Sequence, residues 1–119
     1  MELIETKAKE LSNAIRESGV YQNYLKVKRQ VEKDEVLCKK MNEYRARNFE
    51  LHASLEGEEL YNAMENFERE NALFCKDPLV TQFLAAELDI VRMIQMAEKE
   101  IVDGIDLDLE YQPSDDDDE

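Results

Sequence analysis

A chain of 119 residues with 43% hydrophobic residues is long enough for one domain with a core and too short for two. Its formal net charge of −14 argues against general binding to nucleic acids or anionic membranes, whose surfaces are themselves negative. Residues 103–119 hold nine acidic residues and no basic one, which leaves 20 acidic against 15 basic residues, or −5, for the rest. We therefore expect a helical domain over residues 1–104 and an acidic tail over 105–119.

Apolar residues recur at steps of three and four along the chain, which predicts an all-α protein. The first helix should span residues 2–17 and end at Gly19. The second should span 20–33. The apolar stripe of the first helix consists of Ile4, Ala8, Leu11 and Ile15.

The third helix should begin at Asp34, whose carboxylate can accept hydrogen bonds from the free amides of the first turn. It should end near Leu55, with Gly57 as its stop, and a fourth helix should follow. Both helices carry apolar residues at heptad steps with one asparagine inside the series. The two series are Leu37, Met41, Tyr44, Asn48, Leu51 and Leu55, and then Leu60, Met64, Phe67, Asn71 and Phe74.

Asp77 and Pro78 mark the sharpest boundary, because aspartate caps a helix and proline suits its first position. The fifth helix should run to about Asp103, and its wide apolar face suggests contacts on two sides. Glu87 lies on that face, so we expect it to be paired. A chain this short buries a limited fraction of its surface, so we predict a dimer or higher oligomer. The residues expected at or near that interface are Phe83, Ile90, Val91 and Ile94.

After Gly104, apolar residues alternate with acidic ones up to Tyr111, which predicts a short strand or a docking segment. From Gln112 onward only polar and acidic residues follow, apart from Pro113. We expect residues 112–119 to be disordered and dispensable for folding.

Residues that usually act in catalysis or bind metals and cofactors are few in this sequence. His52 is the one histidine, and Cys38 and Cys75, which have no CxxC neighbour, indicate reduced thiols in a cytoplasmic protein. The sequence has neither a Gly-rich phosphate loop nor HExxH. The N-terminal residues lack the apolar region of a signal peptide. We therefore predict a non-enzymatic protein with no catalytic, cofactor or metal site of its own.

Residues 26–47 carry eight basic and four acidic residues, and residues 48–75 carry seven acidic residues and one basic one. Charge pairing between helices or protomers explains this pattern; so does a basic strip for an acidic partner, including RNA. A recognition patch for a protein partner would consist of Arg45, Arg47, Phe49 and His52, since a partly basic surface with an aromatic ring is common at interfaces.

Three runs together resemble the YlbF/YmcA family of small bacterial helical proteins: IRESGVYQNYLKVKRQVEKD, EVLCKKMNEYRARNFELH and CKDPLVTQFLAAELDIVRMIQMAEKEI. The resemblance covers about residues 3–102 and rests on the order of its parts. These are a Ser-containing turn, Tyr-x-x-Tyr, an Asp before the third helix, a mid-chain Gly, and Asp-Pro before a long last helix. It implies an antiparallel helical bundle that self-associates. It also implies a regulator of competence, sporulation and biofilm formation, acting in a complex that affects mRNA maturation through the endoribonuclease RNase Y.

The resemblance further implies that some such complexes carry iron–sulfur clusters. A Cys₄ site needs four thiolates and this chain has two, so protomers would have to share ligands. The acidic tail is not a feature of the family.

Two alternatives stay open. The heptad series and acidic tail also suit a helical chaperone or scaffold. A small all-α enzyme of the chorismate mutase kind would need several arginines lining a cleft, and Arg92 is the one basic residue between Lys76 and Lys99.

Overall fold

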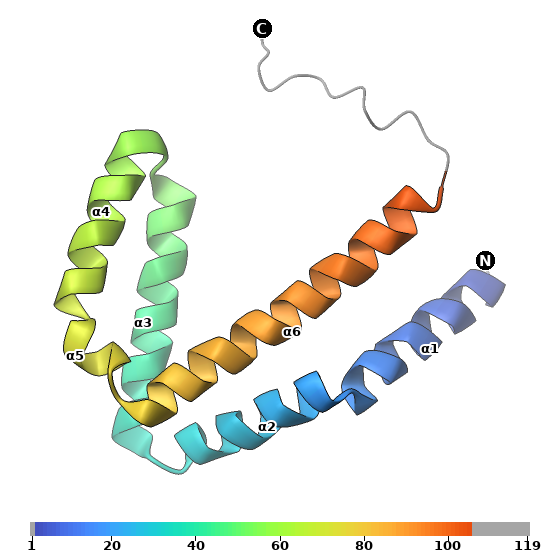
Figure 1. Cartoon of the computed structure of the whole chain (residues 1–119), viewed down its shortest axis with the longest axis horizontal. Coiled ribbons are helices and arrows are strands. Elements are labelled where there is room, and N and C mark those ends of the chain that lie inside the picture. The colour runs from blue at the N-terminus through green and yellow to red at the C-terminus, as the bar shows by residue number, and fades with distance from the viewer. Residues whose placement is uncertain (1, 106–119) are drawn as a thin grey trace, which may run out of the picture.

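The computed structural model describes residues 2–105, which form six helices and no strand (Figure 1). The all-α prediction is confirmed. The helices are α1 (Glu2–Glu17), α2 (Gly19–Glu32), α3 (Glu35–Ser54), α4 (Gly57–Glu70), α5 (Ala72–Cys75) and α6 (Pro78–Asp103). The predicted strand or docking segment up to Tyr111 and the predicted disorder of 112–119 lie outside the described residues, apart from Ile105.

Local side-chain hydrogen bonds fix where α3 and α6 begin. The Asp34 carboxylate accepts a 3.0 Å hydrogen bond from the N–H of Leu37, and that of Asp77 accepts a 2.9 Å bond from the N–H of Leu79. Pro78 follows as the first residue of α6, where its missing N–H needs no acceptor. Both predicted boundaries are confirmed.

The first helix spans Glu2–Glu17, as predicted, but the role of Gly19 and one later boundary differ from the prediction. Gly19 does not end the first helix but opens α2, because the Ser18 hydroxyl accepts from the N–H of Tyr21 at 3.1 Å and caps that helix. The predicted fourth helix is interrupted at Asn71, whose N–H and side-chain amide both donate to the carbonyl of Phe67. The one-turn helix α5 therefore follows as a separate element.

The turn between α3 and α4 also places its glycine differently from the prediction. Gly57 was expected to end the third helix, but α3 ends at Ser54 and Gly57 is the first residue of α4. Its φ of +62° lies in the left-handed region that glycine adopts without steric cost.

The helices form two arms that diverge from a common apex (Figure 1). In one arm α1 and α2 run end to end beside α6, which runs in the opposite direction. The other arm is the antiparallel hairpin of α3 and α4, which α5 connects back to the apex. The radius of gyration is 18.5 Å, against about 13 Å for a compact domain of this size. Antiparallel packing is thus present in each arm, within an open V.

The main core lies at the apex. It consists of Val27 and Val31 of α2, Met41 of α3, and Val80 and Phe83 of α6. A smaller aromatic cluster holds the second arm together, where the ring of Tyr44 lies 4.9 Å from that of Phe67 and 5.5 Å from that of Phe74, centroid to centroid. Tyr44 of the α3 heptad series therefore faces α4 and α5, whereas Leu37 and Met41 of the same series pack at the apex.

Within residues 2–105, no helix is both long and apolar enough to cross a membrane.

Candidate interaction surfaces

The predicted recognition patch on α3 is divided between two flanks of the helix. Arg45, Phe49 and His52 follow one another at steps of four and three, so they share one flank. Arg47 lies two residues from Arg45, which corresponds to about 200° around the helix. The structure thus groups three of the four residues and places Arg47 on the other side.

Arg45 is engaged within the chain. Its Nη2 lies 2.6 Å from Oε2 of Glu87, and its Cζ lies 5.5 Å from the ring centroid of Phe83. The expected pairing of Glu87 is therefore confirmed, with a partner from the other arm. Glu87 is 26% exposed and Arg45 is 42% exposed, so the ion pair sits at the edge of the apex core.

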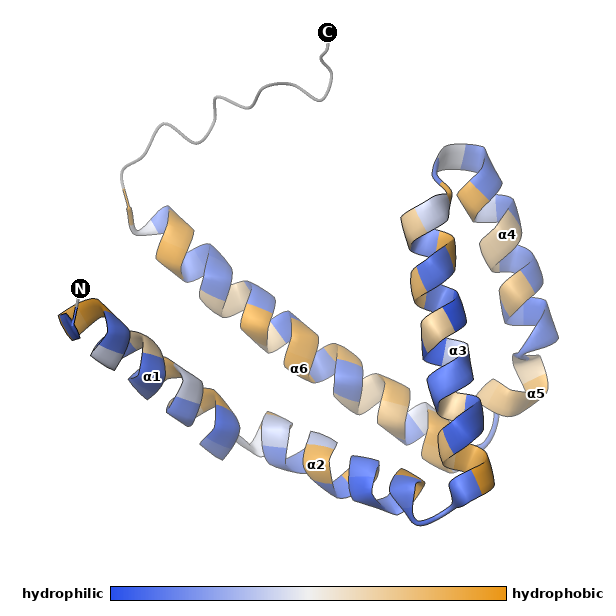
Figure 2. Cartoon of the chain, turned by 180° about the vertical axis from the view of Figure 1, so that it is seen from behind, coloured by the Kyte–Doolittle hydropathy of each residue, from blue (hydrophilic) through white to orange (hydrophobic). Residues whose placement is uncertain are grey.

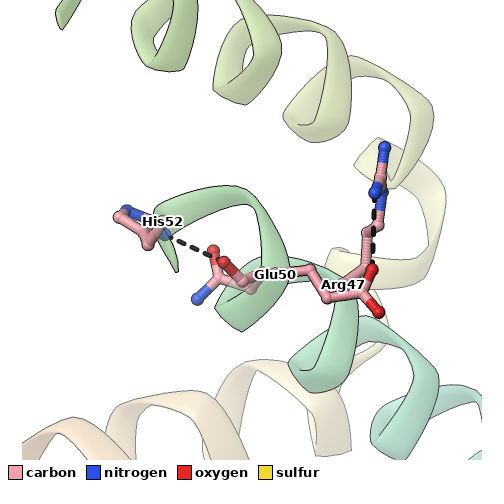
Figure 3. A network of polar contacts seen from close by, with 4 residues as sticks. Arg47, Glu50 and His52 are labelled. Atoms are coloured by element: carbon pink, nitrogen blue, oxygen red, sulfur yellow. Dashed lines mark hydrogen bonds and ion pairs between the residues drawn. The ribbon is translucent and has the colours of Figure 1, made fainter. Parts of the chain in front are cut away.

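The other residues of the predicted patch make contacts within α3 (Figure 3). Arg47 Nη1 lies 3.4 Å from Oε1 of Glu50, and the Nδ1–H of His52 donates to the carbonyl of Asn48 at 2.9 Å. Phe49 is 72% exposed. An exposed phenyl ring buries a large apolar area when a partner covers it, so Phe49 is the side chain of this patch most suited to recognition.

The charge pairing predicted between 26–47 and 48–75 has one instance among the described residues, Arg47 with Glu50, and it lies inside α3. The ion pairs found within residues 2–105 are Lys7–Glu10, Arg45–Glu87, Arg47–Glu50 and Lys99–Asp103. The basic residues of α2 take part in none of these.

The four residues of α6 predicted at an interface occupy two different environments. Phe83 and Ile90 are 2% and 7% exposed and face the chain's own core, whereas Val91 and Ile94 are 41% and 42% exposed. Ile101 and Val102 continue the exposed apolar positions toward the end of the helix. We call Val91, Ile94, Ile101 and Val102 the distal face of α6.

The opening helix also exposes its apolar stripe, which the sequence pattern did not reveal. No residue of α1 is buried, and Ile4 and Leu11 are exposed, while Ile15 is half-buried next to Ser18. Apolar segments recur along both α1 and α6 in Figure 2. Short helices gain most of their stability from burying an apolar face. The rest of the chain does not bury the apolar stripe of α1.

A hollow of about 690 Å³ between α3, α4 and α5 was not anticipated from the sequence either. Tyr44, Phe67 and Phe74 line it, and Val36 and the 83% exposed Leu73 stand at its rim. Burial, together with the neighbouring Cys75 side chain, raises the pKa of Tyr44 to about 12. The rim carries both signs of charge, so it does not select a charged ligand.

The two thiols lie in different surroundings. Cys38 packs against the apex core and Cys75 ends α5; both are free and half-buried. Within residues 2–105, no three His, Cys, Asp or Glu side chains are placed to hold a metal ion. A Cys₄ cluster does not fit the thiolates of a single chain.

A protein-family model described as control of competence regulator ComK, YlbF/YmcA, matches residues 4–106 of the chain. The chain belongs to the YlbF/YmcA family. The match begins in α1 and extends past the end of α6, so it includes both arms of the V. The family is described by a regulatory role.

This YlbF/YmcA chain is also similar to curated bacterial proteins. One is a UPF0342 protein of Caldicellulosiruptor bescii, 28% identical over 101 residues that cover 83% of this chain and 85% of the relative. Another is a UPF0342 protein of Caldicellulosiruptor saccharolyticus, 24% identical over 102 residues, with 84% and 85% covered. No solved structure matches the chain. Most of the acidic tail lies beyond the family match, from residue 107 on.

Proposed function

We propose that this protein is a non-enzymatic, self-associating interaction protein that acts in a regulatory protein complex. As the family implies, the complex would affect mRNA maturation and thereby competence, sporulation and biofilm formation. Membership of a family described by control of a competence regulator supports the regulatory part. The observation that carries the interaction part is the exposed apolar surface of the arm formed by α1 and α6. Contiguous apolar surface on a small soluble protein typically marks a site of association.

A second copy is the partner that suits this arm. The α1 stripe and the distal face of α6 are two apolar faces on one arm, and two such arms together provide the four faces of a helical bundle. A two-fold arrangement uses the same surface on each copy and leaves neither uncovered. An interface of ordinary size needs about 800 Å² on each partner, which a pair of helices of 16 and 26 residues can supply.

The regulatory partner would bind elsewhere, on the flank of α3 that carries Phe49. His52 lies one turn further along the same flank, and Arg45 lies one turn before it, held by Glu87. Aromatic residues and arginine are both enriched at protein interfaces. Arg47 would join such an interface only if the partner also reached the opposite flank.

Affinity purification from the native host tests this function. The wild-type protein should retain a fixed set of partners, and Phe49→Ala should lose them. Tyr61→Ala is the matched control, because Tyr61 is also an exposed aromatic residue of the same arm. Equal retention of the partners by all three proteins would show that the Phe49 surface does not bind them. Capture of many unfolded polypeptides in place of a fixed set would instead favour a chaperone, and turnover of a substrate by the purified protein would contradict the non-enzymatic assignment.

A further inference from the structure

The outward face of α2 carries positive charge that no described residue neutralises. Lys26, Arg29 and Lys33 follow one another at steps of three and four, and all three are exposed. They lie on the side of the helix opposite Val27 and Val31, which are buried in the apex core. Within residues 2–105, none of the three forms an ion pair. We call Lys26, Arg29 and Lys33 the α2 basic face.

The opposite charge is concentrated at the end of the same chain. Residues 106–119 contain eight acidic residues and no basic one, and four of the acids, Asp115 to Asp118, are consecutive. We propose that this acidic segment binds the α2 basic face of its own chain. Attraction between groups of opposite charge favours such a contact, because residues 106–119 contain no basic residue and none of the three bases of the α2 basic face forms an ion pair within residues 2–105.

The segment is long enough to reach the basic face when it is almost fully extended. The ring of Tyr24 lies 5.7 Å from that of Phe83, so α2 packs beside the first turns of α6 and the α2 basic face lies on the far side of α2 from α6. Because α6 runs from there to Asp103, its end is about 30–40 Å along the helix axis from the level of the basic face, at about 1.5 Å per residue, and the path must also pass around α2, which is about 10 Å across. A fully extended chain spans about 3.3 Å per residue, so Asp115 to Asp118 could reach at most about 33–43 Å beyond Ile105. Repulsion between like charges favours this extended form.

The helices α1 and α6, which lie along this path, should not bind the acidic segment in preference to α2. The end of α6 lies beside α1 (Figure 1), and α1 has four acidic and three basic residues. The helix α6 has five acidic and two basic residues. The α2 helix with Lys33 has four basic residues and one acidic residue, Glu32, and much of α2 is drawn as hydrophilic in Figure 2. The segment therefore meets an excess of positive charge at α2.

Nuclear magnetic resonance of the ¹⁵N-labelled full chain tests the contact. At low ionic strength, the amide shifts of residues 106–119 should differ from those of a synthetic peptide of the same sequence. Reversal of the basic face with K26E, R29E and K33E should return them to the peptide values, and so should 1 M salt, where charges more than about 3 Å apart are screened. The matched control reverses three bases of α1, with K7E, K9E and R16E, and should leave the shifts as in wild type. Tenfold dilution of an Ile94→Glu variant, whose charge disfavours the proposed dimer, should change nothing if the contact is within one chain.

Several results would overturn the proposal. These are peptide-like shifts in the wild-type protein, equal changes in both triple variants, or shifts that depend on concentration, which would assign the contact to a second copy. If reversal of the basic face unfolds the protein, Asp115 to Asp118 can be changed to Asn instead, with the amide shifts of residues 22–33 as the readout. Those shifts should then move, and unchanged shifts would contradict the contact.

Discussion

The guanidinium of Arg45 lies 2.6 Å from the carboxylate of Glu87 and joins the two arms of the V just beyond the apex core. No other ion pair found within residues 2–105 crosses from one arm to the other. The same guanidinium lies over the ring of Phe83, so one side chain of α3 makes two contacts with α6.

Removal of the Arg45 side chain should therefore weaken the fold. We expect Arg45→Ala to lower the free energy of unfolding by about 1 kcal/mol, since a partly exposed ion pair and a cation–π contact each contribute up to about 1 kcal/mol. Arg47→Ala, which removes a 3.4 Å pair within α3, should change it by less than about 0.5 kcal/mol. Urea denaturation at one fixed protein concentration measures both values. Equal effects of the two substitutions would show that Arg45 does not connect the arms energetically.

The apex core should be sensitive to loss of volume. Met41 is 1% exposed at the point where α2, α3 and α6 meet, and Met41→Ala should lower the free energy of unfolding by about 2–5 kcal/mol. Met96→Ala serves as the control, because Met96 is exposed on α6 and its loss should cost less than about 0.5 kcal/mol in a single chain. If Met41→Ala proved as mild as Met96→Ala, the core would not lie at the apex.

The two aspartate caps should contribute to stability through the hydrogen bonds that they accept. Asp34→Ala and Asp77→Ala should each cost about 1 kcal/mol. Glu56→Ala is the control, since Glu56 precedes α4 without a side-chain capping bond and should change stability little. Thermal denaturation followed by circular dichroism would rank the three variants, and a Glu56→Ala variant as unstable as the others would contradict the assignment.

Tyr44 should make stability depend on alkaline pH. Its pKa is raised from about 10 to about 12 in the folded protein, mainly by burial, so folding favours the protonated phenol. The stabilisation is complete below pH 10 and is lost as the pH rises through about 12. Denaturation curves at pH 9 to 12 should therefore show a decline that Tyr44→Phe reduces. The same decline in both proteins would show that the titration of a group other than Tyr44 causes it.

The sequence predicted those features of the fold that depend on neighbouring residues. Asp34 and Asp77 mark helix starts because a cap needs only amides a few residues away, and the heptad series of α3 identified residues that are buried, such as Met41 and Leu51. Asn71 was missed as a boundary because it lies within a continuous heptad series. The turn at Ser18 was predicted, but the cap that Ser18 provides for α2 was not. Their competing backbone contacts are visible only in the structure.

The divergence of the arms and the candidate surfaces were harder to predict, because they depend on contacts between distant segments. The apolar stripe of α1 indicates a buried face, and no local signal shows that its own chain leaves it exposed. Likewise, the predicted patch wrongly included Arg47, which helical spacing places on the other flank, and the pairing of Arg45 with Glu87 depends on how α3 crosses α6. Leu73 does not break the apolar pattern around it, so nothing in the sequence indicates that it is exposed. It lies exposed beside the hollow because the helix is interrupted at Asn71.

Sedimentation velocity at micromolar concentration tests the central claim, which is self-association through the arm of α1 and α6. We predict that the wild-type protein sediments as a dimer or larger species, and that Ile94→Glu shifts it toward the monomer because it places a charge in the apolar interface. Leu73→Glu, at an exposed apolar residue of the other arm, should sediment like wild type. A wild-type protein that sediments only as a 14.0 kDa species would contradict the claim.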